Sequence, residues 1–399
     1  MNKRVGPKRK VLIVGGGFGG VKAALALCDR KDIELTLISE RSDFFYFPTM
    51  YHTATGGSSE HSVINLGEIF QGKTIKLYLA KAVSIDREDQ IVTCENGEEF
   101  TYDNVIFSLG VITNYFGIPG LKEHSYGIKS IEGVEQLKRH LHAKLIAENR
   151  PDLNYIIVGG GPTGIELAGS LSSYLHEIIR KHGIKNRVPH IDLVEAMPSL
   201  MPRLPKRVGR VIARRLRRLG VKLYLNSRVE GLTAEELTVS GKPLRNHTVI
   251  WTAGVANNPF FETNGFVMSP RRKVEVDEFL RSEKNIYVIA DNAETTYSGM
   301  AQTAIHDGEF VAHNIICELE DRPKLAYRPK EPIYITPVGP RWASVLWGKK
   351  HFSGIAGYWL RGLADLRGFL DIHDPLDAAE QWSREFDRED LCPVCGEKE

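Results

Sequence analysis

Cysteine is scarce in this chain, and the features that it lacks narrow the classes of protein to which it can belong. Only five of the 399 residues are cysteine, an odd number. A few scattered thiols exclude the disulfide framework of small secreted proteins and favour a reducing compartment. No apolar run reaches the roughly 20 residues that a membrane-spanning helix needs. The net charge is only +2, which gives no indication of a nucleic-acid partner.

Glycine, in contrast, is plentiful, and two of its clusters share one pattern. The 37 glycines include two copies of G-x-G-x-x-G, with Gly15, Gly17 and Gly20 in the first and Gly159, Gly161 and Gly164 in the second. The first glycine of this pattern allows a tight turn, the second lets the backbone approach a pyrophosphate, and the third lets a helix pack on a strand. One copy is a weak signal, but two copies predict two bound dinucleotides.

The first copy lies in a predicted βαβ unit. Apolar patterns predict a strand, a helix and a second strand within residues 10–38. Phe18 and Gly19 belong to the loop before the helix, where a phosphate would meet the positive end of the helix dipole. Glu40 follows Gly20 by 20 residues, and its carboxylate would accept hydrogen bonds from ribose hydroxyls.

The second copy has similar surroundings. The apolar run 154–158 predicts a strand, and Pro162 and Thr163 begin the next helix, where the fixed φ of proline suits the first turn. The strand that follows this helix ends at Glu195. A carboxylate there suits a free 2′-hydroxyl and repels a 2′-phosphate, which predicts NADH rather than NADPH. Two basic residues shortly after Glu195 leave NADPH open.

Three later segments fit a flavoprotein with FAD on the first unit and NADH on the second. Two apolar strands end in turns that contain Gly110 and Gly254, where the chain would leave the flavin unit and return to it. A third strand ends at Asp291, whose carboxylate would bind the ribityl chain or a water linked to the pyrophosphate. The predicted fold is therefore α/β with two Rossmann-like domains.

The same features predict how the chain is divided. We expect a discontinuous FAD-binding domain over 1–114 and 256–325, and an NADH-binding domain over 115–255. A change in composition marks the last part, 326–399, where prolines and aromatic residues accumulate. We expect this part to form a module that faces a membrane or a second subunit.

These motifs resemble those of the two-dinucleotide-binding flavoprotein superfamily, and within it the type II NADH dehydrogenases, which are NADH:quinone oxidoreductases that do not pump protons. The resemblance extends from about residue 10 to residue 370. Its most specific parts are the aromatic segment 45–56, the nucleotide motif 159–169 and the quinone segment 301–306. The resemblance implies FAD as cofactor, NADH as substrate and a quinone as electron acceptor.

The resemblance also implies roles for single side chains. Glu166 would lie at the junction of flavin and nicotinamide and orient the carboxamide, although the helix dipole alone also favours a carboxylate in a first turn. Pro48 and Gln302 would flank the ring face that is open to the quinone. His306 replaces a glutamine of the family, and it would either bond a quinone oxygen or pack within its helix. Ala290 replaces the family's glycine, which predicts only an added methyl near the cofactor.

The positions of the cysteines help to distinguish a type II NADH dehydrogenase from other flavoproteins of the superfamily. Dithiol reductases and sulfide:quinone oxidoreductases need cysteines beside the flavin, and segment 44–56 contains none. Cys28, Cys94 and Cys317 lie outside it. A sulfide:quinone oxidoreductase-like enzyme, a flavin reductase for a soluble acceptor and a non-enzymatic NADH sensor remain as alternative interpretations.

The expected membrane contact lies in the last third of the chain. One face of the predicted helix 354–370 carries Ile355, Trp359, Leu363, Leu366 and Leu370. Such a face suits a helix that lies in a membrane interface, and packing on the body or on a second subunit is the alternative. The basic first ten residues lack an apolar signal-peptide core. We therefore expect peripheral attachment at the cytoplasmic side of the cell membrane, and a homodimer.

Two smaller features complete the predictions. Cys392 and Cys395 form a C-x-x-C pair, which is half of a four-ligand zinc site. Two tails of a homodimer would complete the site, or the tail would stay free of metal. The arginine-rich segment 203–219 predicts a helix whose arginines face solvent.

Overall fold

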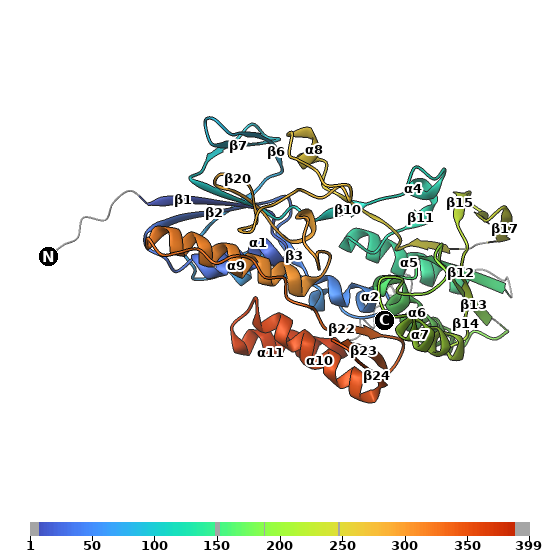
Figure 1. The fold of residues 1–399 in the computed structure, drawn as a ribbon. Coiled ribbons are helices and arrows are strands. Elements are labelled where there is room, and N and C mark those ends of the chain that lie inside the picture. Colours follow the sequence, from blue (N-terminus) through green and yellow to red (C-terminus); the bar gives the residue numbers. More distant parts are fainter. Residues whose placement is uncertain (1–7, 148–151, 187, 246–247, 388–399) are drawn as a thin grey trace.

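The structure, a computed structural model, describes residues 8–147, 152–186, 188–245 and 248–387. Two mainly parallel sheets covered by helices lie side by side, and a smaller C-terminal unit packs below them in the view of Figure 1. This arrangement confirms the predicted α/β fold with two Rossmann-like halves. Within the described part of the chain, no helix is both long enough and apolar enough to cross a membrane.

The first half is built on a six-stranded sheet. Its strands follow the order β20 (Arg281–Glu283), β21 (Ile286–Val288), β9 (Asn104–Phe107), β1 (Arg9–Val14), β2 (Ile33–Ser39) and β5 (Lys76–Leu79). The last four residues of β1 are buried, as expected for a parallel strand that is covered on both faces. One cover is the pair α1 (Phe18–Leu27) and α9 (Ala301–Leu319), where a Cβ on Gly308 would lie 2.4 Å from the carbonyl oxygen of Gly19.

The opposite face of this sheet carries an antiparallel sheet of β6 (Ala82–Asp86), β7 (Ile91–Cys94) and β8 (Glu99–Thr101). Short elements fill the connections: β3 (Asp43–Phe45), α2 (Met50–Thr53), β4 (Val63–Asn65), α3 (Leu66–Ile69), α4 (Leu121–His124) and α8 (Phe260–Thr263). In the structure, the helix that was predicted after the first glycine loop begins at Phe18, which lies within the loop itself.

The second half contains a five-stranded parallel sheet. Its strands follow the order β11 (Ser125–Tyr126), β18 (Thr248–Trp251), β12 (Asp152–Val158), β13 (Val188–Val194) and β14 (Val221–Tyr224). The helices α5 (Ile131–Ala147), α6 (Pro162–Lys181) and α7 (Lys206–Arg218) complete this half, together with a small sheet of β15 (Val229–Leu232), β16 (Glu236–Val239) and β17 (Lys242–Arg245).

The two glycine loops fold alike. A Cβ on Gly20 would lie 1.9 Å from the carbonyl oxygen of Gly15, and a Cβ on Gly164 would lie 2.0 Å from that of Gly159. Both distances are far below van der Waals contact, so the third position of each loop admits glycine alone. The helix can then begin immediately after the strand.

An antiparallel ribbon joins the two halves. It consists of β10 (Val111–Thr113) and β19 (Val255–Asn257), which carry the chain out of the first sheet and back to it. The residues before these strands, Gly110 and Gly254, have φ values of 66° and 80°. Glycine adopts this left-handed conformation without steric cost, which explains why both crossings contain it.

The C-terminal unit is more regular than its prolines suggest. It contains an antiparallel sheet of β22 (Tyr334–Pro337), β23 (Ala343–Trp347) and β24 (Lys350–Gly354), followed by α10 (Ile355–Leu370) and α11 (Pro375–Ser383). Arg215 of α7 ties this unit to the second half, because its guanidinium donates to the carbonyl oxygens of Val338 and Pro340 at 3.2 Å. The prediction that every arginine of this helix faces solvent is therefore wrong for Arg215.

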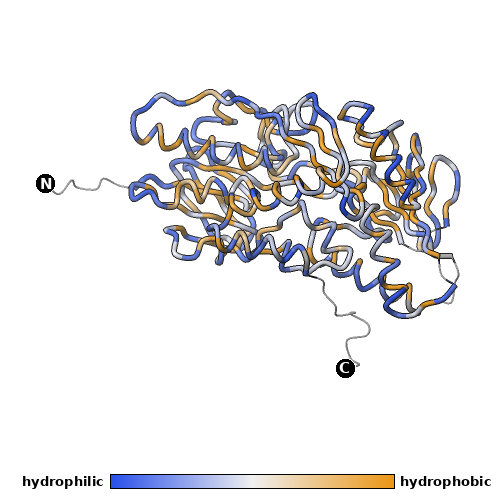
Figure 2. The backbone as a smooth tube through the Cα atoms, turned by 90° about the horizontal axis from the view of Figure 1, so that it is seen from below, coloured by the Kyte–Doolittle hydropathy of each residue, from blue (hydrophilic) through white to orange (hydrophobic). Residues whose placement is uncertain are grey.

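Helix α10 reverses the usual arrangement of a surface helix. Ile355, Trp359 and Leu363 are 61%, 64% and 60% exposed, whereas Arg361 and Asp365 are buried. Figure 2 views the molecule from the side on which α10 and α11 lie, and apolar positions recur along the helices there. The charged face of α10 therefore packs on the body, and its apolar face is left open.

Candidate active site

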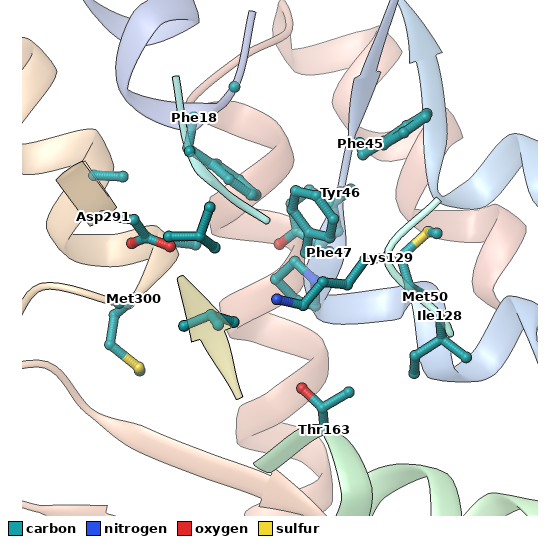
Figure 3. A pocket seen from close by; sticks show the side chains of 18 of the residues that line it. Phe18, Phe45, Tyr46, Phe47, Met50, Ile128, Lys129, Thr163, Asp291 and Met300 are labelled. Atoms are coloured by element: carbon teal, nitrogen blue, oxygen red, sulfur yellow. The ribbon is translucent and has the colours of Figure 1, made fainter. Parts of the chain in front are cut away.

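One large cavity runs between the two halves and the C-terminal unit. Its volume is about 1870 Å³, well above the 300–1,000 Å³ of pockets for drug-sized ligands. The close-up in Figure 3 shows side chains from both halves, including Phe18, Tyr46, Thr163 and Asp291, pointing into the same space. A cavity of this size suits two dinucleotides placed end to end.

The first glycine loop forms one end of the cavity. Gly15, Gly17, Phe18, Gly19 and Glu40 line it, whereas Gly20 is not part of the lining. A Cβ on Gly15 would lie 2.1 Å from the carbonyl oxygen of Ser108, so a side chain is excluded there. A Cβ on Gly17 would meet no atom within 4 Å. The loop therefore leaves open space at the N-terminus of α1, which fits a pyrophosphate.

The second glycine loop meets the cavity through Pro162 and Thr163. The lining does not include the three glycines of this loop, nor Glu195 or Gly254, which were predicted to bind nucleotide. As at Gly17, a Cβ on Gly161 would meet no atom within 4 Å, so the space above this loop is open as well.

Glu195 holds the second glycine loop in place. One carboxylate oxygen accepts a hydrogen bond from the backbone N–H of Gly160 at 2.6 Å, and the other accepts one from that of Met197 at 2.7 Å. These bonds occupy one lone pair on each oxygen. A carboxylate oxygen can accept further bonds, so the side chain retains acceptors that could reach a ribose.

Asp291 and Gly110 line the cavity between the two loops. The side chain of Asn292 fixes this region, because it accepts a bond from the N–H of Gly110 at 3.0 Å and donates to its carbonyl oxygen at 2.7 Å. Ala290 receives support from Asp307, whose carboxylate accepts a bond from its N–H at 3.0 Å. The turn that carries Asp291 is thus braced from two sides.

Ala290 itself is strained. Its φ is 60°, and an L-residue in this left-handed region costs about 1–2 kcal/mol. The expectation that Ala290 only adds a methyl near the cofactor is therefore wrong, because the main cost of replacing glycine lies in the backbone.

We expect Ala290→Gly to raise the free energy of unfolding by about 0.5–1 kcal/mol, because the relief of strain exceeds the added chain entropy of glycine. Urea unfolding with and without added FAD measures the change. Ala293→Gly is the matched control, because Ala293 is buried in the same turn with an ordinary φ of −84°. Equal destabilisation by both substitutions would contradict the assignment of strain.

Glu166 lies in a buried ionic network in the wall of the cavity. Its Oε1 is 3.5 Å from Nη1 of Arg361. The same guanidinium donates from Nε to Asp365 at 2.6 Å and from Nη2 to the carbonyl oxygen of Pro48 at 2.6 Å. Tyr46 completes the network, since its hydroxyl lies 3.2 Å from Asp365. The α10 helix thereby reaches the segment that was predicted to flank the flavin ring.

Burial raises the pKa of Glu166 to about 8, although the charge of Arg361 acts in the opposite direction. The carboxyl group is therefore mostly protonated at neutral pH. Asp365 lies closer to Arg361 and is the ion-pair partner. Sequence reasoning singled out Glu166 as a candidate, and its role stays a prediction. It missed Arg361 and Asp365, whose spacing of four residues on a helix is the signal that could have revealed the pair.

Gln302 and His306 lie on successive turns of α9, and both line the cavity. The amide of Gln302 pairs with the backbone of Ile333, donating to its oxygen at 3.2 Å and accepting from its nitrogen at 3.3 Å. Nε2 of His306 lies 3.2 Å from the carbonyl oxygen of Arg328 and must donate to it. Only Nδ1 of His306 then remains for a ligand.

Three cysteines lie within the described residues, and none of them lines the cavity. Cys28, Cys94 and Cys317 are buried and free. Cys392 and Cys395, the predicted zinc ligands, lie outside the described residues. Over the residues that the structure describes, no group of three or more histidine, cysteine or acidic side chains could hold a metal ion.

The sequence pattern of the pyridine nucleotide-disulphide oxidoreductases matches residues 9–308. The chain belongs to this family. The match includes both glycine loops, the joining ribbon and the first turns of α9. The family shares the two nucleotide-binding units, and the disulphide of its name has no counterpart at the cavity, where the described lining contains no cysteine.

Curated relatives narrow the resemblance. A type II NADH:quinone oxidoreductase of Mycobacterium tuberculosis is 29% identical over 350 residues, which cover 78% of this chain and 73% of that protein. A type II NADH:quinone oxidoreductase of Staphylococcus saprophyticus is 26% identical over 340 residues, which cover 79% of this chain and 84% of that protein. Within its family, the chain thus resembles the quinone-reducing enzymes, as its motifs predicted.

Solved structures share the fold. NDH2 of Plasmodium falciparum in complex with NADH superposes with a TM-score of 0.84 at 17% identity, over 95% of this chain and 97% of that one. The sulfide:quinone oxidoreductase of Aquifex aeolicus superposes with a TM-score of 0.76 at 20% identity, over 94% of this chain and 92% of that one. The fold alone therefore does not separate the two activities, and the lining of the cavity has to do so.

Proposed function

We propose that this chain is a non-proton-pumping NADH:quinone oxidoreductase that binds FAD. The observation that carries the proposal is the single cavity, which joins both glycine loops and continues past Glu166 to Gln302. FAD held in this cavity would supply the redox chemistry, a hydride acceptor for NADH and a two-electron donor for the quinone. The contribution of the protein is to place the reactants and to exclude water.

The residues proposed to hold FAD come from the first half. Gly15, Gly17 and Gly19 open the space for the pyrophosphate, Glu40 bonds the adenosine ribose, and Asp291 bonds the ribityl region. The second loop, with Thr163 and Glu195, takes NADH. Gly110 and Gly254 act through the left-handed turns that they allow, and Gly20 and Gly164 act by letting the helix approach the backbone of the glycine loop closely.

The quinone is proposed to bind in the part of the cavity that Pro48, Gln302 and His306 line. The carbonyl of Pro48 is held by Arg361, and the amide of Gln302 is held by Ile333. With the ring proton on Nε2, Nδ1 of neutral His306 is an acceptor, so it can accept a hydrogen bond from a hydroxyl group of the quinol product. The proton held on the carboxyl group of Glu166 is available for quinol formation at neutral pH.

Anaerobic titration tests the proposal. NADH should bleach the flavin absorbance of the purified protein, and a short-chain quinone should restore it. NADPH serves as the comparison, because Arg203 lines the cavity and its guanidinium would suit the 2′-phosphate that distinguishes NADPH from NADH. Colourless protein that takes up no added FAD, or flavin that sulfide bleaches and NADH does not, would contradict the assignment.

We further propose that the open face of α10 lies on the cytoplasmic surface of the cell membrane. Ile355, Trp359 and Leu363 supply the apolar face. The neighbouring turn between β23 and β24 adds the exposed Lys349 and Lys350, which suit anionic headgroups. Attachment there would bring a lipid-soluble quinone close to the cavity.

The double variant Ile355→Ser/Trp359→Ser should bind vesicles that contain anionic lipid at least about tenfold more weakly, because each buried side chain contributes about 1.5–3 kcal/mol. Co-sedimentation measures the loss, and turnover with a soluble quinone should persist, since neither residue lines the cavity. Val267→Ser, at a 67% exposed position of the first half, is the control. Unchanged vesicle binding, together with dissociation of the dimer, would instead place this face of α10 in a homodimer interface. We propose a homodimer in either case.

A further inference from the structure

Lys129 is a cation inside the cavity whose ammonium has no hydrogen-bond partner in the described part of the protein. It lies between β11 and α5 and lines the cavity. Its Nζ is fully buried and makes no hydrogen bond within the described part of the chain. Removing a charge from water without a partner costs several kcal/mol. Such a group indicates a ligand that arrives after folding.

Two other cations near the cavity already have hydrogen-bond partners within the protein. Nζ of Lys273 donates to the carbonyl oxygen of Asp291 at 2.9 Å and also to the hydroxyl of Ser298. The guanidinium of Arg361 donates hydrogen bonds to Asp365 and to the carbonyl oxygen of Pro48. Lys129 differs from both, because the geometry that holds it leaves its ammonium unpaired.

Figure 3 shows the direction of the side chain. The ammonium of Lys129 points into the open space between Asp291 on one side and Tyr46 and Phe47 on the other. Asp291 is near enough to influence its pKa, which burial lowers and the aspartate raises, but no hydrogen bond joins them. The space in front of Nζ is therefore free for a ligand beside the segment that leads to Pro48.

The two ends of FAD need positive potential at different places. At the pyrophosphate, the open N-terminus of α1 above Gly17 supplies it. Lys129 lines the same cavity as the aromatic segment that contains Tyr46 and Phe47, and Figure 3 shows its ammonium directed into the space that these side chains also border. We expect the flavin ring in this region, so the unpaired ammonium faces the ring.

We propose that Lys129 is a cofactor-binding residue whose ammonium pairs with the flavin ring of bound FAD and favours the reduced form. The inference rests on the proposed function. The oxidised ring is neutral, and a hydride adds two electrons and one proton, which leaves one negative charge. A fixed ammonium interacts more strongly with the charged form than with the neutral one. Lys129 belongs to the second half of the protein, and it thus raises the reduction potential of a cofactor that the first half holds.

Spectroelectrochemical titration of the FAD-loaded protein tests the inference. Lys129→Met keeps the length of the side chain and removes its charge. We expect the preference for reduced flavin to fall about tenfold, which is a shift of about 30 mV to a more negative midpoint for a two-electron couple. Lys129→Arg should restore the wild-type potential. Lys122→Met is the control, because Lys122 lines the same cavity but is exposed to solvent.

Thermal unfolding of the FAD-free protein gives a second readout. Lys129→Met should unfold at a higher temperature than the wild type, because the unpaired buried charge is gone. A midpoint potential equal to that of the wild type would overturn the inference. So would an equal loss of affinity for oxidised and reduced FAD, which would mean a phosphate or ribityl contact instead. Wild-type protein that takes up no FAD would defeat the proposed function before any variant is compared.

Discussion

Arg361→Ala is expected to lower the free energy of unfolding by about 3–5 kcal/mol, the cost of breaking a buried ion pair by removing one partner. The substitution leaves the carboxylate of Asp365 buried without its cation, since Asp365 is only 5% exposed. It also frees the carbonyl oxygen of Pro48, to which the guanidinium donates at 2.6 Å. Two groups that folding removed from water would then lack their main partner.

The same helix supplies a matched control. Arg367 pairs with Asp371 at 3.0 Å, again at a spacing of four residues, but its side chain is 73% exposed. Arg367→Ala should therefore cost less than about 1 kcal/mol. Chemical unfolding at saturating FAD and without FAD measures both variants. Similar losses for Arg361→Ala and Arg367→Ala would show that the buried network does not stabilise the fold.

Glu166→Gln is expected to lower the rate of quinone reduction by about 10²-fold, within the usual contribution of a general acid. Glutamine has nearly the same shape and can still donate a hydrogen bond, but it carries no transferable proton. Reduction of the flavin by NADH should change little, because hydride transfer depends on placement, and glutamine keeps the shape and the hydrogen-bonding atoms with which Glu166 would orient the carboxamide. Rapid mixing with NADH alone, and then with a quinone, separates the two half-reactions.

The pH dependence of quinone reduction gives an independent check. Because burial raises the pKa of Glu166 to about 8, the protonated fraction falls as the pH rises through that value. Turnover of the wild type should therefore decline above about pH 8. Glu166→Gln should lack this decline. The same inflection in both proteins would assign it to another group and remove Glu166 from the proton transfer.

Local motifs carried most of the fold prediction. A glycine loop between a strand and a helix is a short-range pattern, and its steric requirement is visible in the spacing alone, as Gly15 and Gly20 show. The strands that flank it are buried on both faces, so they read as continuous apolar runs. The exposed apolar face of α10 also follows from the sequence, because helical periodicity places Ile355, Trp359 and Leu363 together.

Long-range contacts accounted for what was missed. Arg361 lies 195 residues from Glu166 and 313 from Pro48 along the chain, and no local pattern brings them together. Lys129 looks like an ordinary residue before a helix until the cavity around it is seen. Ala290 looks harmless until its φ of 60° is known. Glu195 ends its strand as predicted, yet its oxygens also hold Gly160 and Met197.

The sequence by itself determined the two nucleotide-binding units, the likeness to NADH:quinone oxidoreductases and the apolar stripe of the last long helix. Each of these rests on short motifs or periodic patterns, none longer than about one strand–helix unit, in which steric requirements and hydrophobic periodicity act locally. Only the tertiary structure decided that the charged face of α10 is buried against Glu166 and that Lys129 meets the cavity unpaired. Desolvation of a charge depends on every element packed around it, and that environment exists only once the chain has folded.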